Sequence, residues 1–192
     1  TISADGSTIT EVASLEHDID HGNYNSLVQV DSDTYALAYQ GADSDGFIAT
    51  FTISADGSTI TEVASLEHDT DHCIYNSLVK VDSDTYALAY GGTDQDGYIT
   101  TFTISADGST ITEVASLEHD TGVVSSVSLV QVDSDTYALS YTGLSLDGFI
   151  TTFTISSDGS SIEQVAQLLH DDTHCSYNSF VQVSSNTFAL AY

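Results

Sequence analysis

Hydrophobic and polar positions alternate along short runs of the chain, and these runs recur in a fixed order. The clearest example begins with Leu27–Val30 and continues, after an Asp-Ser-Asp turn, into Thr34–Tyr39. A second turn leads into Phe47–Ile53, and the Asp56-Gly57 pair opens a further run, Thr59–Leu66. Alternation with a period of two is typical of β-strands, and Asp-Gly favours hairpins because glycine adopts positive φ without a Cβ clash. We therefore predict a four-stranded antiparallel meander.

The meander recurs along the chain with a period of 51 residues. Self-similarity at a period of this size indicates a solenoid, a propeller or another array of structural units. We interpret residues 1–192 as a single domain built from such units. The repeats comprise residues 1–51, 52–102, 103–153 and 154–192, and they begin at Thr1, Thr52, Thr103 and Thr154.

The two faces of the predicted sheet differ in the size of their side chains. Tyr35, Leu37 and Tyr39 project on one side of the second strand, whereas Ala36 and Ala38 project on the other. Stacking such sheets with bulky against small faces buries both, and this is the arrangement of blades in a β-propeller. The predicted fold is therefore all-β, a β-propeller of four-stranded antiparallel blades.

The size of the ring stays open. The first repeat starts within the third strand of a unit, at Thr1, and the fourth stops after the second strand, at Tyr192. The termini could share one blade and close a four-bladed ring, which would remove exposed strand edges. Alternatively, the chain is part of a larger ring of roughly six to eight blades, in which case half-rings are expected to self-associate.

The outer hairpin of each repeat, represented by Gly97–Ile111 with the sequence GYITTFTISADGSTI, resembles the outer-strand hairpins of β-propeller repeats. It is similar in particular to the seven-bladed lactonase and YVTN-type propellers. The resemblance covers the third and fourth strands of each repeat. It implies a propeller fold and, as one functional alternative, a lactone or ester hydrolase.

The charge balance of the chain restricts its partners. One lysine and no arginine stand against 29 acidic residues, so the formal net charge is −28. Because there is no cationic surface to contact phosphates, neither nucleic acid nor an anionic membrane is expected as a partner. A strongly solvated surface and a cation-binding surface both explain the charge. The near absence of trypsin-type sites favours a secreted, extracellular protein.

Loops that join the fourth strand of one unit to the first strand of the next carry the residues best suited to chemistry. His21, His72 and His174 occupy the same position in three loops, and Val123 replaces them in the other. In a propeller these loops surround one mouth of the channel. Three imidazoles and an open position predict a zinc or copper site, and turn capping is the alternative. Candidates to orient the rings are Asp20, Asp71 and Asp172.

The same three loops end in a Tyr-Asn pair. Tyrosine offers a stacking face and a polar end, so a ring of tyrosine and amide groups could recognise a sugar. Core tyrosines and turn asparagines are the alternative interpretation. The candidate ligand-binding residues are Tyr24, Tyr75 and Tyr177 together with Asn25, Asn76 and Asn178.

The two cysteines, Cys73 and Cys175, lie in equivalent loops two repeats apart. Thiolate is a ligand for zinc or copper, so both residues are candidate metal ligands. Two alternatives stay open, which are free thiols and a disulfide, and a disulfide requires Cα atoms within about 7 Å.

A second cation candidate is the turn between the second and third strands. Alternating carboxylates that end in glycine can supply oxygen ligands to calcium, as the start of an EF-hand loop does. An ordinary hairpin turn is the alternative. The candidate calcium ligands are Asp43 and Asp45 in the first unit and Asp94 and Asp96 in the second.

The sequence carries no G-x-S-x-G elbow, H-E-x-x-H helix or phosphate-cradling glycine loop. Near-identical repeats favour a non-enzymatic role, since an active site needs asymmetric parts. We therefore predict a binding or scaffold module for a glycan or another small neutral or cationic ligand, with calcium or zinc as the ions that the candidate sites would accept. The alternative is a metal-dependent lactone or ester hydrolase with its histidine site at the channel mouth.

Overall fold

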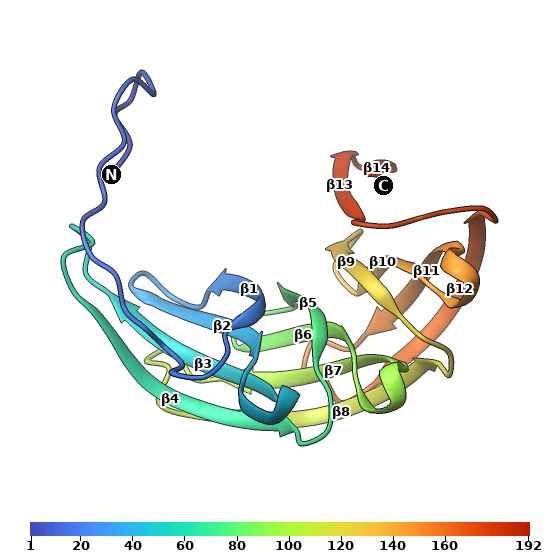
Figure 1. Ribbon diagram of the computed structural model, residues 1–192, viewed down its shortest axis with the longest axis horizontal. Helices are drawn as coiled ribbons and strands as arrows, with labels where there is room; N and C mark the ends of the chain where they lie inside the picture. The colour runs from blue at the N-terminus through green and yellow to red at the C-terminus, as the bar shows by residue number, and fades with distance from the viewer.

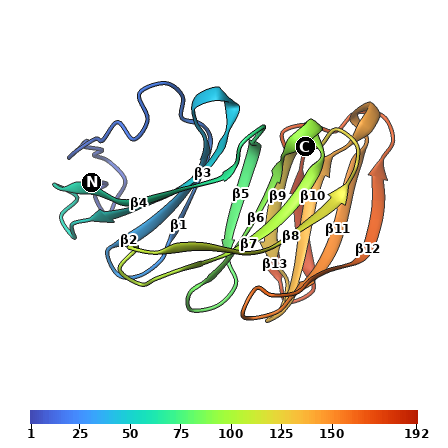
Figure 2. The ribbon, with the colours of Figure 1, turned by 90° about the horizontal axis from the view of Figure 1, so that it is seen from below.

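The computed structural model describes residues 1–192 and contains fourteen strands and three short 3-10 segments. Three four-stranded antiparallel sheets follow one another along the chain, and a two-stranded sheet comes last. We call them blades 1, 2 and 3 and the half-blade. Figure 1 shows that they form an arc, with the first strand of each unit on the concave side, and Figure 2 shows the blades side by side.

Each complete blade is a meander in which neighbours in the chain are neighbours in the sheet. Blade 1 contains β1 (Asn23–Gln29), β2 (Thr34–Gln40), β3 (Gly46–Ile53) and β4 (Ile60–Asp69). Blade 2 contains β5 (Ile74–Lys80), β6 (Thr85–Gly91), β7 (Gly97–Ile104) and β8 (Ile111–Asp120). Blade 3 contains β9 (Ser125–Gln131), β10 (Thr136–Thr142), β11 (Gly148–Ile155) and β12 (Ile162–Asp171). The half-blade contains β13 (Ser179–Ser184) and β14 (Thr187–Ala191).

The four predicted runs are therefore strands, and the meander is confirmed. The turn between the second and third strands differs from a simple hairpin, because it contains a 3-10 segment. These segments are η1 (Ala42–Ser44), η2 (Thr93–Gln95) and η3 (Leu144–Leu146). No helical segment of the structure has the length and apolar character that crossing a membrane requires.

The segment before β1 and the half-blade lie at opposite ends of the arc (Figure 1). The first segment holds a single antiparallel bridge, between Ile2 and Ile9. The two strands of the half-blade pair only with each other. Closure of a ring through one blade shared by the termini therefore stays a prediction.

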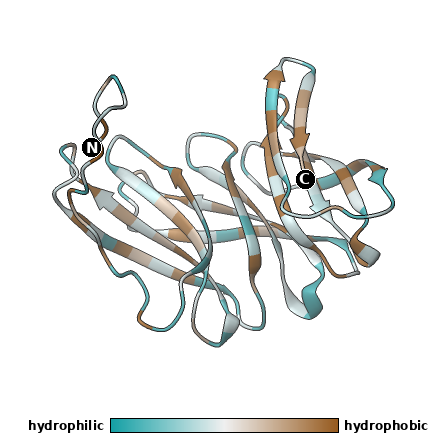
Figure 3. Ribbon diagram, turned by 45° about the horizontal axis from the view of Figure 1, so that its top comes forward, coloured by the Kyte–Doolittle hydropathy of each residue, from teal (hydrophilic) through white to brown (hydrophobic).

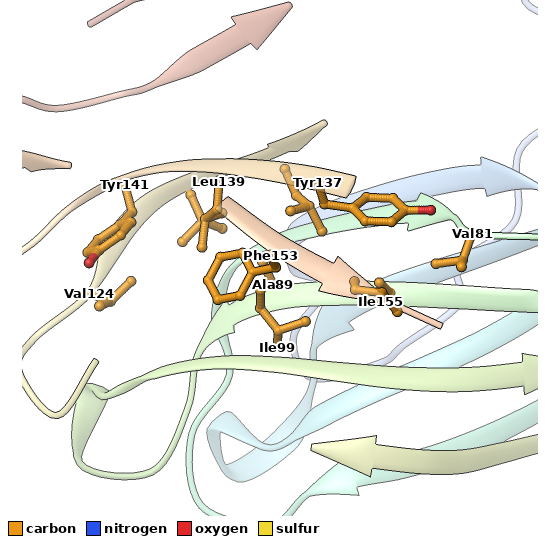
Figure 4. Close-up of a cluster of buried hydrophobic side chains, with 12 residues drawn as sticks. Val81, Ala89, Ile99, Val124, Tyr137, Leu139, Tyr141, Phe153 and Ile155 are labelled. Carbon is orange, nitrogen blue, oxygen red and sulfur yellow. The ribbon is translucent and has the colours of Figure 1, made fainter. Parts of the chain in front are cut away.

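The core consists of bulky faces packed on small faces, as the alternation predicts. Between blades 1 and 2, Ala36 and Ala38 belong to the same buried cluster as Tyr86 and Leu88. The next interface repeats this arrangement one period later, and Figure 4 shows Ala89 and its neighbours among the larger side chains of blade 3. Figure 3 shows the underlying alternation of apolar and polar positions along the strands.

Hydrogen bonds tie the innermost strands of successive blades together. Ser26 Oγ accepts the backbone N–H of Leu78 at 2.9 Å, and Ser77 Oγ accepts that of Leu129 at 3.0 Å. The same bond recurs between blade 3 and the half-blade, where Phe180 N–H donates to a serine at 3.1 Å. These bonds thus fix the position of each innermost strand, along the strand direction, relative to the innermost strand of the preceding blade.

A buried threonine ties each outer hairpin to the preceding blade. Thr101 Oγ1 of blade 2 donates to the carbonyl oxygen of Gly159 in blade 3 at 2.7 Å. The same oxygen accepts the backbone N–H of Ala115 at 3.2 Å. Thr50 makes the equivalent bond from blade 1 to blade 2, so this interaction belongs to the repeat.

A histidine ring from each blade also enters the next core. His119 makes edge-to-face contacts with Tyr141 and Phe153, with ring centroids 5.2 and 5.5 Å apart. Glycine at the start of the third strand provides the space, because a Cβ on Gly97 would lie 2.7 Å from this imidazole. Burial lowers the pKa of His119 to about 4, and His68 one repeat earlier behaves in the same way.

We expect Thr101→Val to lower the free energy of unfolding by about 1–3 kcal/mol, because it leaves the Gly159 carbonyl and the Ala115 amide without their buried partner. Thr152→Val is the matched control, since Thr152 occupies the equivalent position in blade 3 and only reaches Ala166 O at 3.5 Å. Urea unfolding of both variants measures the difference. Equal losses would show that the bond across the interface contributes nothing.

We expect stability to fall as the pH decreases from 6.5 to about 4. In this window the unfolded chain protonates its histidines, whereas folded His68 and His119 stay neutral, so each costs about 1.4 kcal/mol per pH unit. Unfolding free energies measured across the window should give a shallower slope in His119→Gln, by one proton. An unchanged slope in this variant would contradict the burial of a neutral ring.

Candidate ligand-binding site

A pocket of about 340 Å³ lies where the innermost strands begin, on the concave side of the arc. The structure brings together here all six predicted ligand-binding residues, which come from loops far apart in the sequence. In the third repeat Ser126 and Val127 take the places of tyrosine and asparagine. The lining consists of Tyr24, Asn25, Tyr75, Asn76, Ser126, Val127, Tyr177 and Asn178.

A distortion of the backbone places the aromatic side chains in this pocket. The pairing register shifts between Asn23 and Ser26 in β1, and the same shift recurs in β5. Tyr24, Tyr75 and Tyr177 have φ values of 53°, 57° and 58°. The left-handed region costs a non-glycine residue about 1–2 kcal/mol, and an extra residue in a strand re-aims its side chain. Three of the residues with left-handed backbone therefore carry the aromatic side chains of the pocket.

Tyr75 occupies the centre of the aromatic group. Its ring lies 4.7 Å from that of Tyr24, centroid to centroid, at an interplanar angle of 47°. Burial raises the pKa of Tyr75, and the neighbouring Tyr24 and Tyr177 hydroxyls raise it further. Tyr177 is almost fully exposed. The pocket thus has one packed aromatic wall and one open tyrosine.

Two of the asparagines that line the pocket, Asn76 and Asn178, have an amide nitrogen without a hydrogen-bond partner. The Cys73 thiol donates to Asn76 Oδ1 at 3.0 Å, and the Cys175 thiol donates to Asn178 Oδ1 at 2.9 Å. The Nδ2 atoms of Asn76 and Asn178 are buried and have no hydrogen-bond partner in the structure. Because a buried unpaired donor is costly, an acceptor oxygen from a ligand would stabilise these amides.

In the first repeat, the equivalent asparagine amide has a hydrogen-bond partner within its own loop. Gly22 stands where the second and fourth repeats have cysteine, and Asn25 Nδ2 donates to the Gly22 carbonyl oxygen at 2.8 Å. Its amide is therefore satisfied within the loop.

The two cysteines are free and buried. Burial raises the pKa of both the Cys73 and the Cys175 thiol, so they stay protonated and can donate. The nearest imidazole nitrogen to Cys73 Sγ is 3.9 Å away, on His68. The thiols therefore orient the amides of the pocket.

The structure does not bring the candidate metal ligands together. His21 and His174 are exposed, and His72 is half-buried beside Asp71 and Asp94 in a polar hollow of about 270 Å³. No group of three or more histidine, cysteine, aspartate or glutamate side chains has a metal-binding arrangement. Joint binding of a transition metal by the three histidines thus stays a prediction without geometric support.

Carboxylates in these loops cap turns. Asp69 Oδ1 accepts the backbone N–H groups of Asp71 and His72 at 3.0 and 3.2 Å. Asp18 and Asp171 accept the equivalent bonds in the first and last of these loops. The three carboxylates expected to orient the histidine rings are exposed, namely Asp20, Asp71 and Asp172.

The candidate calcium turns are closed by their own backbone. Gly41 N–H donates to the Asp45 carbonyl oxygen at 2.9 Å, and Asp45 N–H donates to the Ala42 carbonyl oxygen at 3.0 Å. Asp94 and Asp96 occupy the same positions in the turn of blade 2. The Ser44 carbonyl oxygen in the first turn also accepts the Cys73 backbone N–H. This bond attaches the loop between β4 and β5 to the turn. Calcium binding at these turns stays a prediction.

Sequence reasoning missed the histidines that matter most to the core. His17, His68, His119 and His170 are present in all four repeats, whereas the candidate metal series loses its member at Val123. Their recurrence in every repeat could have identified them, because a side chain that packs in the interface between blades is needed once in each repeat.

No protein-family model and no curated protein matches the sequence. Several solved structures match its fold. Sqt1 from Saccharomyces cerevisiae superposes with a TM-score of 0.62 at 15% identity, covering 92% of this chain and 42% of Sqt1. A protein from Lactobacillus plantarum gives 0.62 at 17% identity, with coverages of 87% and 49%.

The periplasmic gluconolactonase PpgL from Pseudomonas aeruginosa gives a TM-score of 0.58 at 14% identity, covering 85% of this chain and 61% of PpgL. The chain therefore spans about half the length of these structures. At such identities the likeness concerns the fold alone. All three are β-propellers, and together with the repeated four-stranded antiparallel sheets they show that this chain has the β-propeller fold.

Proposed function

We propose that the chain is a non-enzymatic binding module that recognises a neutral, oxygen-rich ligand of the glycan class at the Tyr-Asn pocket. One observation carries the proposal: tyrosine rings line the same pocket as Asn76 and Asn178, whose buried amide nitrogens have no hydrogen-bond partner. A sugar ring presents a C–H face that packs on tyrosine and hydroxyl oxygens that accept from amides. The ligand would supply the partners that Asn76 and Asn178 lack.

The charge of the chain supports a neutral ligand. No charged residue lines the pocket, and the chain as a whole carries a formal charge of −28. The negative charge of the chain would repel an anionic ligand during its approach, and the pocket contains no cationic side chain to bind it. A neutral polyhydroxyl compound meets neither obstacle. The setting that we propose is extracellular, supported by the single lysine of the chain.

The third repeat gives the pocket an open side. Ser126 keeps the left-handed backbone of its equivalents, with φ of 52°, but has no ring to fill the space. Val127 likewise lacks the amide of Asn76. A ligand seated against Tyr75 would therefore extend over Ser126, where a fourth tyrosine would otherwise stand.

We expect binding on a glycan array, and we expect Asn76→Asp to weaken it about tenfold, corresponding to about 1.4 kcal/mol. The aspartate keeps an oxygen that accepts from Cys73 but lacks the unpartnered N–H donor that we propose the ligand satisfies. Asn186→Asp is the matched control, because it adds the same charge at an exposed hairpin position. Isothermal titration calorimetry with the best array hit compares the two.

Ser126→Tyr should also weaken binding, since its ring closes the open side of the pocket and the hydrogen bond that the Tyr177 backbone N–H donates to Ser126 Oγ at 3.0 Å is lost. Thermal melts of all variants check that the fold is retained. Equal affinities of Asn76→Asp and Asn186→Asp would place the ligand elsewhere. Absence of any array signal, or tight binding of heparin or DNA at physiological salt, would overturn the proposal.

A further inference from the structure

The two outer faces of the blade array are apolar, and neither is fully covered. One is the bulky face of blade 1, and the other is the small face of the half-blade. At every internal interface, faces of these two kinds pack on each other. The outer faces are therefore two complementary halves of an interface that the chain already builds twice between complete blades.

The bulky face of blade 1 is open around β1, whereas Leu37, Tyr39 and Phe51 on β2 and β3 are buried. Leu27 on β1 is 57% exposed, whereas its counterparts Leu78 and Leu129 are 4% and 3% exposed. An apolar groove of about 150 Å³ lies beside it. The groove is lined by Leu15, His17, Leu27, Leu37, Phe51, Ile53 and Ile60.

The small face of the half-blade shows the same contrast. Val183 on β13 is 64% exposed, whereas its counterparts Val30 and Val81 are 6% and 9% exposed. Ala189 and Ala191 on β14 are exposed too, at positions where blade 1 has fully buried alanines. An apolar face of this kind on a solvated, highly charged chain marks an interaction surface.

We propose that the bulky face of blade 1 of a second copy of this chain docks on the small face of the half-blade. Within one copy the two faces lie at opposite ends of an open arc, so they do not meet (Figure 1). Two copies placed head to tail form two identical contacts, and such contacts give a closed ring when the rotation closes. Each copy spans about half of the propellers that it resembles, which suits a two-chain ring.

The repeat also supplies the polar part of this interface. At each internal contact a serine on the innermost strand accepts the backbone N–H of the residue one period and one position later. Continuing the series, Ser179 Oγ would accept the Leu27 N–H of the second copy. The new contact thus reproduces both the packing and the hydrogen bond of the existing ones.

Charge sets the conditions under which the copies associate. Each chain has a formal net charge of −28, so two copies repel each other at low ionic strength. At about 1 M salt the Debye length falls to about 3 Å, which screens this repulsion while the apolar contact is retained. Association should therefore increase with salt, opposite to the behaviour of contacts between unlike charges.

The test is sedimentation equilibrium of the 192-residue chain at low salt and at about 1 M NaCl. We expect a species of twice the 20.3 kDa chain mass at high salt. Leu27→Asp and Val183→Asp should each abolish it. Val165→Asp should not, because Val165 is an exposed position of β12 whose counterpart Val114 stays exposed beside a complete interface.

A mixture of the Leu27→Asp and Val183→Asp chains separates head-to-tail docking from misfolding. Each chain keeps one intact face, so the mixture should form a heterodimer through a single contact although neither variant associates alone. A wild-type monomer at every salt concentration, polymers without a limiting mass, or a mixture that stays monomeric would each overturn the proposal.

Discussion

The packing of a bulky blade face on a small one is the interaction on which the rest of the structure depends. An isolated four-stranded sheet with a tyrosine and leucine face could not keep that face from water. Alanine on the opposite face lets the next sheet approach closely enough to bury the bulky face of one blade and the small face of the other. Because the sequence repeats, the same packing recurs at each interface. Stability therefore resides in the interfaces, and each interface also sets where the next innermost strand begins.

That placement creates the pocket. Because every blade presents its loop at the same height, Tyr24, Tyr75 and Tyr177 reach one site although they are 51 or more residues apart. The left-handed backbone at Tyr24, Tyr75, Ser126 and Tyr177 costs stability, and the packing of the neighbouring blades compensates for this cost. Identical units alone would place a tyrosine at every equivalent position. Because Ser126 replaces the tyrosine of the third unit, the pocket is asymmetric and open on that side.

Sequence periodicity was sufficient to predict the strands, their order and the way the blades stack. The predicted tyrosines and asparagines line one pocket, since they follow the loops that surround the axis, and ligand binding there stays a proposal. The histidines were harder to predict, because His68 near the end of β4 and His72 in the following loop stand only four residues apart, and only the structure shows that the His68 ring points into the core. The direction of the His68 side chain depends on the 3-10 turn and on the space that Gly46 leaves for the imidazole ring. Neither feature can be predicted from the alternation of apolar and polar residues.

Divergence between the copies then determines the chemistry of the pocket. Where cysteine follows the loop, its protonated thiol holds Asn76 Oδ1 and leaves the amide nitrogen without a partner. Where Gly22 stands, Asn25 turns to the backbone and its donor is used up. Two buried thiols with raised pKa values thus position the side chains of Asn76 and Asn178, and through them the core beneath the pocket would influence binding at the proposed site.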